Sequence, residues 1–138
     1  MVDYTQELNI LVVDDVEVHR FLMTSGLLRI NPFAKVVQAT GVAQAKERIS
    51  KPGAIFQVVI SDWNMPDGGG AELVRWMRSM AAYKRVPFVM ISGNDEQEKI
   101  IQAFMDLGVD AYVVKPFTPA SLYEKAIKAI EKKKTATR

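Results

Sequence analysis

The chain has 138 residues, a formal net charge of +2 and no cysteine. A chain of this length is expected to form one domain, which we predict to span residues 1–138 with a core from about 8 to 132. The lack of cysteine excludes thiol catalysis, disulfides and cysteine-based zinc sites. The balance of 18 basic and 16 acidic residues argues against nucleic-acid binding through bulk charge.

Residues 1–8 carry two acidic side chains and no apolar run, so they do not read as a signal peptide. No stretch approaches the roughly 20 apolar residues that a membrane-spanning helix requires. We therefore expect a cytoplasmic protein that does not enter a membrane.

Short apolar runs alternate along the chain with longer segments of helical period. We predict strands at residues 9–13, around 36–37, and at 56–61, 87–91 and 111–114. Helices are predicted after Asp15 as far as Asn31, at 42–50, after Gly70, at 96–107 and from Pro119 onward, with Thr118 as the cap of the last. Helical spacing places on one face of their helices Val18, Phe21, Leu22, Ser25 and Leu28; Leu73, Trp76, Met77 and Met80; and Leu122, Ala126, Ala129 and Ile130.

This alternation of five strands and five helices predicts an α/β fold. The strands are continuous apolar runs, which indicates that helices cover both faces of the sheet. Strands joined by helical crossovers are parallel, with right-handed connections. We therefore predict a doubly wound, five-stranded parallel sheet.

Polar residues follow four of the five predicted strands. Asp14 and Asp15 end the first strand, Asp62 the third, Ser92 the fourth and Lys115 the fifth. Because ligands bind at the carboxyl ends of strands in open α/β sheets, these side chains should converge on one edge.

Three carboxylates a few ångströms apart repel one another and call for a counter-charge. Mg²⁺ prefers oxygen ligands, uses few carboxylates and accepts phosphate oxygens. A carboxylate nucleophile, Mg²⁺, a lysine and a hydroxyl are the parts that phosphoryl transfer to an aspartate requires. The sequence lacks a P-loop and a dinucleotide fingerprint, and its single histidine argues against a His-based zinc site or a catalytic triad.

The motifs Leu-Val-Val-Asp14-Asp15, Asp62-Trp-Asn-Met-Pro66, Ser92 and Lys115-Pro116-Phe117 carry a family resemblance. In this order and spacing, over roughly residues 8–132, the chain resembles the receiver domain of two-component response regulators, and most of all its single-domain, chemotaxis-type members. The resemblance implies a flavodoxin-like (βα)5 fold with strand order 2-1-3-4-5.

The resemblance also implies a role for each matching residue. Asp62 would be the phosphoacceptor. Asp15 would bind Mg²⁺ directly, Asp14 mainly through water, and Asn64 through its backbone carbonyl. Lys115, in a cis bond to Pro116, would pair with the phosphoryl group. Ser92 would be the switch hydroxyl, and Tyr112 the aromatic switch residue that turns inward as Ser92 moves.

Two features depart from the family pattern. Asp67-Gly68-Gly69-Gly70 stands where the family usually has a bulkier residue before an Asp-Gly pair, which predicts a less rigid loop. The run from Ser92 to Lys115 is one residue longer than usual, which predicts a shifted fourth helix. His19 is a candidate for tuning access to the phosphoryl group, although a rim position without a special task is the simpler reading, and Asn94, two residues past Ser92, is a candidate for influencing the attacking water.

The sequence therefore predicts a phosphorylation-controlled binding module rather than an enzyme. A sensor histidine kinase or a phosphotransfer domain would donate to Asp62, and the phosphoryl group would change binding at the face made by the fourth helix, fifth strand and fifth helix. A flagellar motor switch protein is a candidate partner, and we expect a monomer. The alternatives are a phosphorelay intermediate, a constitutive interaction module and a small Mg²⁺-dependent phosphohydrolase.

Overall fold

The computed structural model describes residues 2–93 and 97–136; for residues 97, 99, 104, 105, 135 and 136 it describes the backbone alone. Its elements are, in order, β1 (Asn9–Val13), α1 (Glu17–Ile30), β2 (Lys35–Ala39), α2 (Val42–Ser50), β3 (Val58–Asp62), α3 (Gly69–Arg78), β4 (Phe88–Ser92), α4 (Gln97–Gln102), the π-helical η1 (Ala103–Leu107), β5 (Ala111–Val114) and α5 (Pro119–Ala136). None of the helices in these ranges is long and apolar enough to cross a bilayer.

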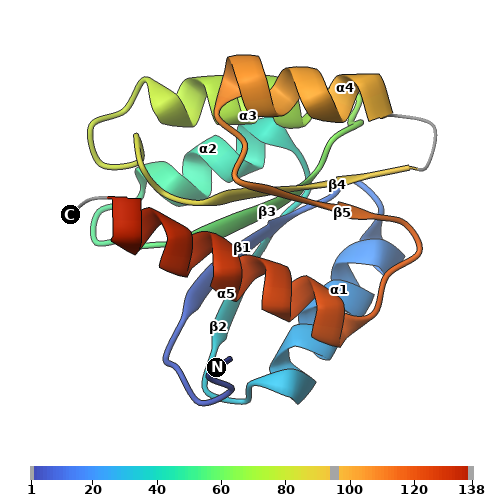
Figure 1. The fold of residues 1–138 in the computed structure, drawn as a ribbon, viewed down its shortest axis with the longest axis vertical. Helices are drawn as coiled ribbons and strands as arrows, with labels where there is room; N and C mark the ends of the chain where they lie inside the picture. Colours follow the sequence, from blue (N-terminus) through green and yellow to red (C-terminus); the bar gives the residue numbers. More distant parts are fainter. Residues whose placement is uncertain (1, 94–96, 137–138) are drawn as a thin grey trace.

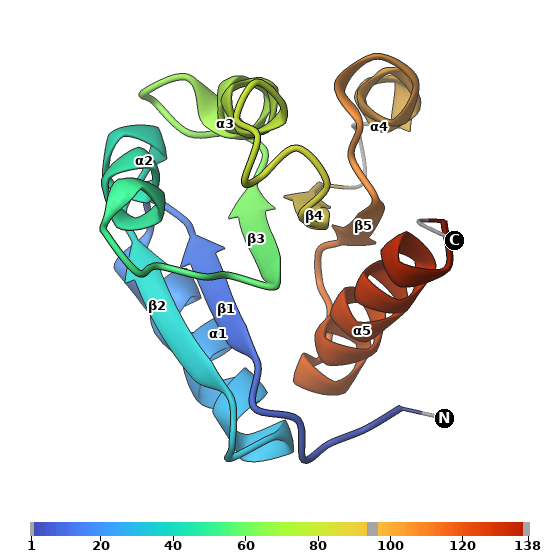
Figure 2. The same cartoon turned by 90° about the vertical axis from the view of Figure 1, so that its left-hand side faces the viewer.

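The five strands form one parallel sheet in the order β2-β1-β3-β4-β5. Helices α1 and α5 cover one face, and α2, α3 and α4 cover the other (Figures 1 and 2). The predicted doubly wound, flavodoxin-like fold and its strand order are confirmed.

Each sheet face carries its own apolar core, as expected for strands that are buried on both sides. Strand residues such as Leu11 and Val59 pack toward α2 and α3, whereas Ile10 and Ile60 pack toward α1 and α5. The predicted inner face of α5 is confirmed by the burial of Leu122, Ala126, Ala129 and Ile130. The predicted cap is also present, because the Ser121 N–H donates to Thr118 Oγ1 at 3.1 Å.

The predicted inner face of α1 is wrong. Val18, Phe21 and Leu22 are exposed by 63%, 62% and 60%, whereas Met23 and Leu27 are buried. Apolar residues occur almost all around this helix, so their spacing alone does not select one face. Its true contact face is set by α5, where a Cβ on Gly26 would lie 2.6 Å from Pro119 Cγ.

Several boundaries also differ from prediction, and β4 runs from Phe88 to Ser92 rather than from 87 to 91. Strand β3 begins at Val58 rather than at residue 56. Helix α3 already includes Gly69 and Gly70, and it ends at Arg78, before Met80. The prediction started this helix after Gly70, and glycine is a poor helix former, but both Gly69 and Gly70 lie within α3.

The fourth helix ends in η1, where the Gly108 N–H donates to Ala103 O, five residues earlier. A π-turn holds one residue more than an α-turn, so η1 takes up one more residue of the run between Ser92 and Lys115 than an α-turn would. Ile100 is buried, as core packing predicts. The side chain of Phe104 and all of Asn94 lie outside the described parts of the chain.

Candidate functional site

Strand register brings the predicted site residues to one level of the sheet. Val13 of β1 is paired with Ser61 of β3, so Asp14 and Asp62 follow at the same height. Asp62 is paired with Ile91 of β4, which places Ser92 one residue beyond. Ser92 is paired with Val114, and the Lys115 N–H donates to Ser92 O at 2.9 Å.

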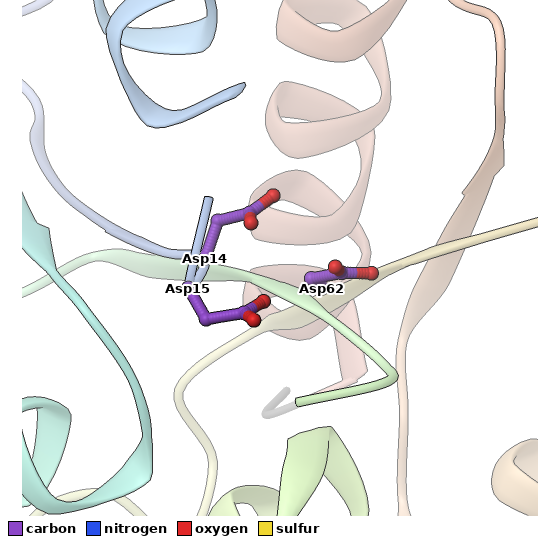
Figure 3. A group of neighbouring side chains, drawn as sticks. All are labelled: Asp14, Asp15 and Asp62. Atoms are coloured by element: carbon purple, nitrogen blue, oxygen red, sulfur yellow. The ribbon is translucent and has the colours of Figure 1, made fainter. Parts of the chain in front are cut away.

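The three aspartates lie side by side at this edge (Figure 3). One carboxylate oxygen from each of Asp14, Asp15 and Asp62 lies within 4.8 Å of the others. Asp14 and Asp62 are buried, and Asp15 is exposed. Hard oxygen donors at this spacing, open to water on one side, fit a cation such as Mg²⁺, which keeps several waters.

Asp14 is held in place through both its backbone and its side chain. Its N–H donates to Ala39 O at 3.1 Å, and its Oδ1 accepts from the Val16 N–H at 2.9 Å. The Arg20 guanidinium donates to Asp14 O at 2.8 Å, and His19 Nδ1 lies 3.6 Å from Asp14 Oδ2. His19 therefore borders the acidic site without entering it, as a rim residue would.

Asp62 is the carboxylate with both a positive and a negative neighbour. Lys115 Nζ lies 3.4 Å from Asp62 Oδ1. Burial raises the pKa of the Asp62 carboxyl; the positive charge of Lys115 acts in the opposite direction, and the negative charge of Asp14 raises the pKa further. The ionised form of Asp62 is thus disfavoured in the folded protein, and a bound cation would stabilise it.

Ser92 Oγ is fully buried and has no hydrogen-bond partner among the described residues. Buried hydroxyls are normally paired, so an unpaired one requires a reason. Ser92 lies at the end of β4, next to Lys115 and one strand from Asp62.

The remaining predicted residues lie at the rim. The Lys115–Pro116 peptide bond is cis, as the resemblance implied. Tyr112 on β5 is 40% exposed, and Lys125 Nζ lies 5.8 Å from its ring centroid, so its ring faces outward here. Asn64 is exposed in the β3–α3 loop.

The β3–α3 loop approaches the strand end closely. The Gly70 N–H donates to Trp63 O at 3.0 Å, and the Trp63 N–H donates to Ile91 O at 2.9 Å. Gly69 has φ +71°, and a Cβ there would lie 2.5 Å from Trp63 O. The glycines therefore allow a close contact that no larger residue could make, which the sequence alone did not indicate.

Sequence reasoning also missed an apolar groove beside the acidic site. A cavity of about 440 Å³ lies between α1 and the segment that follows β5. Its wall includes Leu22, Phe117 and Leu122, and Asp14 and Lys115 stand at its border. Phe21 and Val18 of α1 are also exposed. Their helical spacing predicts a core position, so the sequence does not indicate that they are exposed.

Comparisons with known proteins agree with this geometry. The sequence matches the response regulator receiver domain family over residues 10–127. Chemotaxis protein CheY1 of Helicobacter pylori is 36% identical over 118 residues, which are 86% of this chain and 93% of the relative. Chemotaxis protein CheY-3 of Vibrio cholerae is 35% identical over 127 residues, which are 92% of this chain and 95% of the relative.

Among solved structures, chemotaxis response regulator CheY4 of Vibrio cholerae matches with a TM-score of 0.80 and 29% identity, over 90% of this chain and 99% of that one. The sequence match and the shared fold lead to the same assignment. The chain belongs to the response regulator receiver domain family, whose members are signalling domains rather than conventional enzymes.

Proposed function

We propose that this chain is a phosphorylation-controlled signalling protein that accepts a phosphoryl group on Asp62 from a phosphohistidine donor. The observation that carries the proposal is the convergence of three carboxylates within 4.8 Å with Lys115, beside a buried hydroxyl that lacks a partner. We further propose that it acts in the cytoplasm and as a monomer.

Asp14, Asp15, Asp62 and the backbone carbonyl of Asn64 are the residues that would hold Mg²⁺. When bound, the ion supplies positive charge at the phosphoryl oxygens. Asp62 supplies the nucleophilic oxygen, which forms a bond to phosphorus as the bond from phosphorus to the donor's imidazole nitrogen breaks. Lys115 pairs with a phosphoryl oxygen, and Ser92 donates its unused hydrogen bond to another. Hydrolysis of the acyl phosphate then resets Asp62.

The added phosphoryl charge, about −1.5 to −2, would bias a two-state surface. Ser92 and Tyr112 are the proposed switch residues, because one lies buried beside Asp62 and the other is exposed on the neighbouring strand. The output face would be formed by α4, β5 and α5, where Ile101 is also exposed. The names of its relatives support a role in chemotaxis, with a flagellar motor switch protein as the candidate partner.

The apolar groove and the exposed side of α1 are the proposed docking surface for the donor. Exposed apolar patches mark interaction sites, and this one borders Asp14 and Lys115, where the donor's phosphohistidine must arrive. Phe21→Ser should slow transfer from a phosphohistidine protein but leave transfer from acetyl phosphate unchanged. Equal slowing with both donors would contradict this assignment.

The main test is intact-protein mass spectrometry after incubation with Mg²⁺ and acetyl phosphate. Wild-type protein should gain one phosphoryl group, stable in acid and lost in base, and Asp62→Asn should gain none. No adduct on the wild type, or an equal adduct on both, would overturn the proposal. For the output role, pull-down with a phosphoryl mimic bound should enrich a motor switch protein, and its absence would argue against chemotaxis.

A further inference from the structure

We infer that Arg20 is a positioning residue for the metal site, because its guanidinium holds the peptide group that joins Asp14 to Asp15. The inference rests on the proposed function, since it concerns the geometry of the same carboxylates. Arg20 lies in the first turn of α1, directly after the site, and its side chain reaches back to the end of β1.

The contact is a half-buried hydrogen bond from a charged donor to the backbone. Arg20 Nη1 donates to Asp14 O at 2.8 Å. The Arg20 N–H donates to Val16 O at 3.1 Å, which fixes the base of the side chain in the helix. Hydrogen bonds in which the donor is ionised are shorter and roughly twice as strong as neutral ones. The peptide group between Asp14 and Asp15 is therefore tied firmly to α1.

This bond acts on Asp15 through its backbone. The two peptide planes that flank a residue set its φ and ψ, and with them the direction in which its side chain leaves the chain. The plane before Asp15 is held by Arg20. The plane after Asp15 is held by the Val16 N–H, which donates to Asp14 Oδ1 at 2.9 Å. Both planes that direct the Asp15 side chain are thus bonded, one to Arg20 and one to Asp14.

Asp15 is the carboxylate of the site that most needs this support. Its side chain is exposed and makes no hydrogen bond or ion pair to any residue that the structure describes. One of its oxygens nevertheless lies within 4.8 Å of those of Asp14 and Asp62, and Figure 3 shows the side chain extending toward Asp62. Carboxylates this close repel one another, so a looser backbone would let Asp15 turn away and would weaken cation binding.

The test measures Mg²⁺ binding by tryptophan fluorescence, with urea denaturation to establish that each variant is folded. Arg20→Met keeps an apolar stem and removes the donor. It should weaken Mg²⁺ binding by about three- to tenfold, at or below the range typical for residues that orient metal ligands. Charge alone predicts the opposite sign, because removal of one cation favours another nearby. Mg²⁺ binding by Arg20→Met as tight as in the wild type, or tighter, would overturn the inference.

Two further variants separate the hydrogen bond from the charge. Arg20→Lys restores the charge and a donor, so it should bind Mg²⁺ more tightly than Arg20→Met; binding no tighter would leave only repulsion between cations and overturn positioning. Arg29→Ala is the matched control, since it removes the same charge from an exposed position in the last turn of α1. Its Mg²⁺ affinity should stay within about twofold of wild type. A loss as large as that of Arg20→Met would assign the effect to net charge and overturn the inference.

A double-mutant cycle tests whether Arg20 acts through Asp15. In an Asp15→Asn background the positioned carboxylate is gone, so Arg20→Met should weaken Mg²⁺ binding further by less than about twofold. A further loss equal to that in the wild-type background would show that Arg20 does not act through Asp15, and would overturn the inference. If the wild type binds no Mg²⁺, the proposed function itself fails, so the two failures are distinguishable.

Discussion

Removal of the Asp62 charge is predicted to stabilise the metal-free protein. At an effective dielectric of about 20, carboxylates 4.8 Å apart repel by about 3.5 kcal/mol, and the Lys115 ammonium at 3.4 Å attracts Asp62 by about 5 kcal/mol. Solvent screening reduces both values, and burial of the Asp62 carboxyl, which is the largest cause, together with the charge of Asp14 outweighs the attraction by Lys115 and disfavours the ionised form. Asp62→Asn should raise the free energy of unfolding by about 1–2 kcal/mol, or Tm by roughly 3–8 °C.

The assay is thermal and urea denaturation of both proteins, with EDTA and then with Mg²⁺. Mg²⁺ should stabilise the wild type more than Asp62→Asn, because an ion that binds the folded state raises the free energy of unfolding by an amount that grows with the logarithm of its affinity. An Asp62→Asn protein that is less stable than wild type in EDTA would refute this reasoning. So would an equal gain from Mg²⁺ in both proteins.

The same comparison has a defined pH dependence. The pKa of Asp62 is raised in the folded state, chiefly by burial, so the folded protein binds the proton more tightly than the unfolded chain does. The ionised Asp62 carboxylate therefore lowers the free energy of unfolding. This effect is complete above the pKa of Asp62 in the folded protein, and it disappears as the pH falls toward about 4, the ordinary pKa of aspartate. The advantage of Asp62→Asn should therefore be full at neutral pH and shrink on acidification. If the stability difference between Asp62→Asn and the wild type instead grew toward acid pH, a raised pKa of Asp62 would be contradicted.

Three further substitutions separate the parts of the molecule. Lys115→Ala should tighten Mg²⁺ binding, because a neighbouring cation is removed, but it should slow phosphorylation by about 100-fold. Weaker Mg²⁺ binding would be inconsistent with the 3.4 Å distance from Lys115 Nζ to Asp62 Oδ1. Ser92→Ala should change the free energy of unfolding of the unphosphorylated protein by less than about 0.5 kcal/mol, since no hydrogen bond is lost. It should also reduce the change in tryptophan fluorescence on phosphorylation. A large loss of stability would show that the Ser92 hydroxyl has a hydrogen-bond partner after all. Arg78→Lys should cost about 2–4 kcal/mol in urea denaturation, because its guanidinium donates to Tyr83 O, Val86 O, Gly108 O and Asp110. Its Mg²⁺ affinity should be unchanged, since these contacts lie at the opposite edge of the sheet.

The fold and the acidic site could be predicted because both depend on local order along the chain. Each apolar run ends in a chemically distinct residue, and parallel strands must bring those ends to one edge. The sequence therefore predicts that Asp14, Asp62 and Lys115 lie together, and the structure brings them together.

What could not be predicted depends on contacts between distant segments. The buried face of α1 is chosen by its packing on α5 at Gly26, and the apolar residues of the helix alone do not reveal it. The hydrogen bond from the Ala43 N–H to Asp67 Oδ2 joins residues 24 positions apart and leaves no sequence pattern. The glycines after Asp67 predict a loose loop. Only the structure shows that glycine is required there, because a Cβ on Gly69 or Gly70 would clash with Trp63.

Location of the phosphoryl group on the chain tests the central claim most directly. After incubation with acetyl phosphate and Mg²⁺, borohydride reduction converts an aspartyl phosphate to homoserine, and peptide mass spectrometry then identifies the position. Homoserine at residue 62 alone, dependent on Mg²⁺, is the predicted result. Homoserine at residue 14 or 15, or at none of the three, would contradict the assignment of Asp62 as the phosphoacceptor.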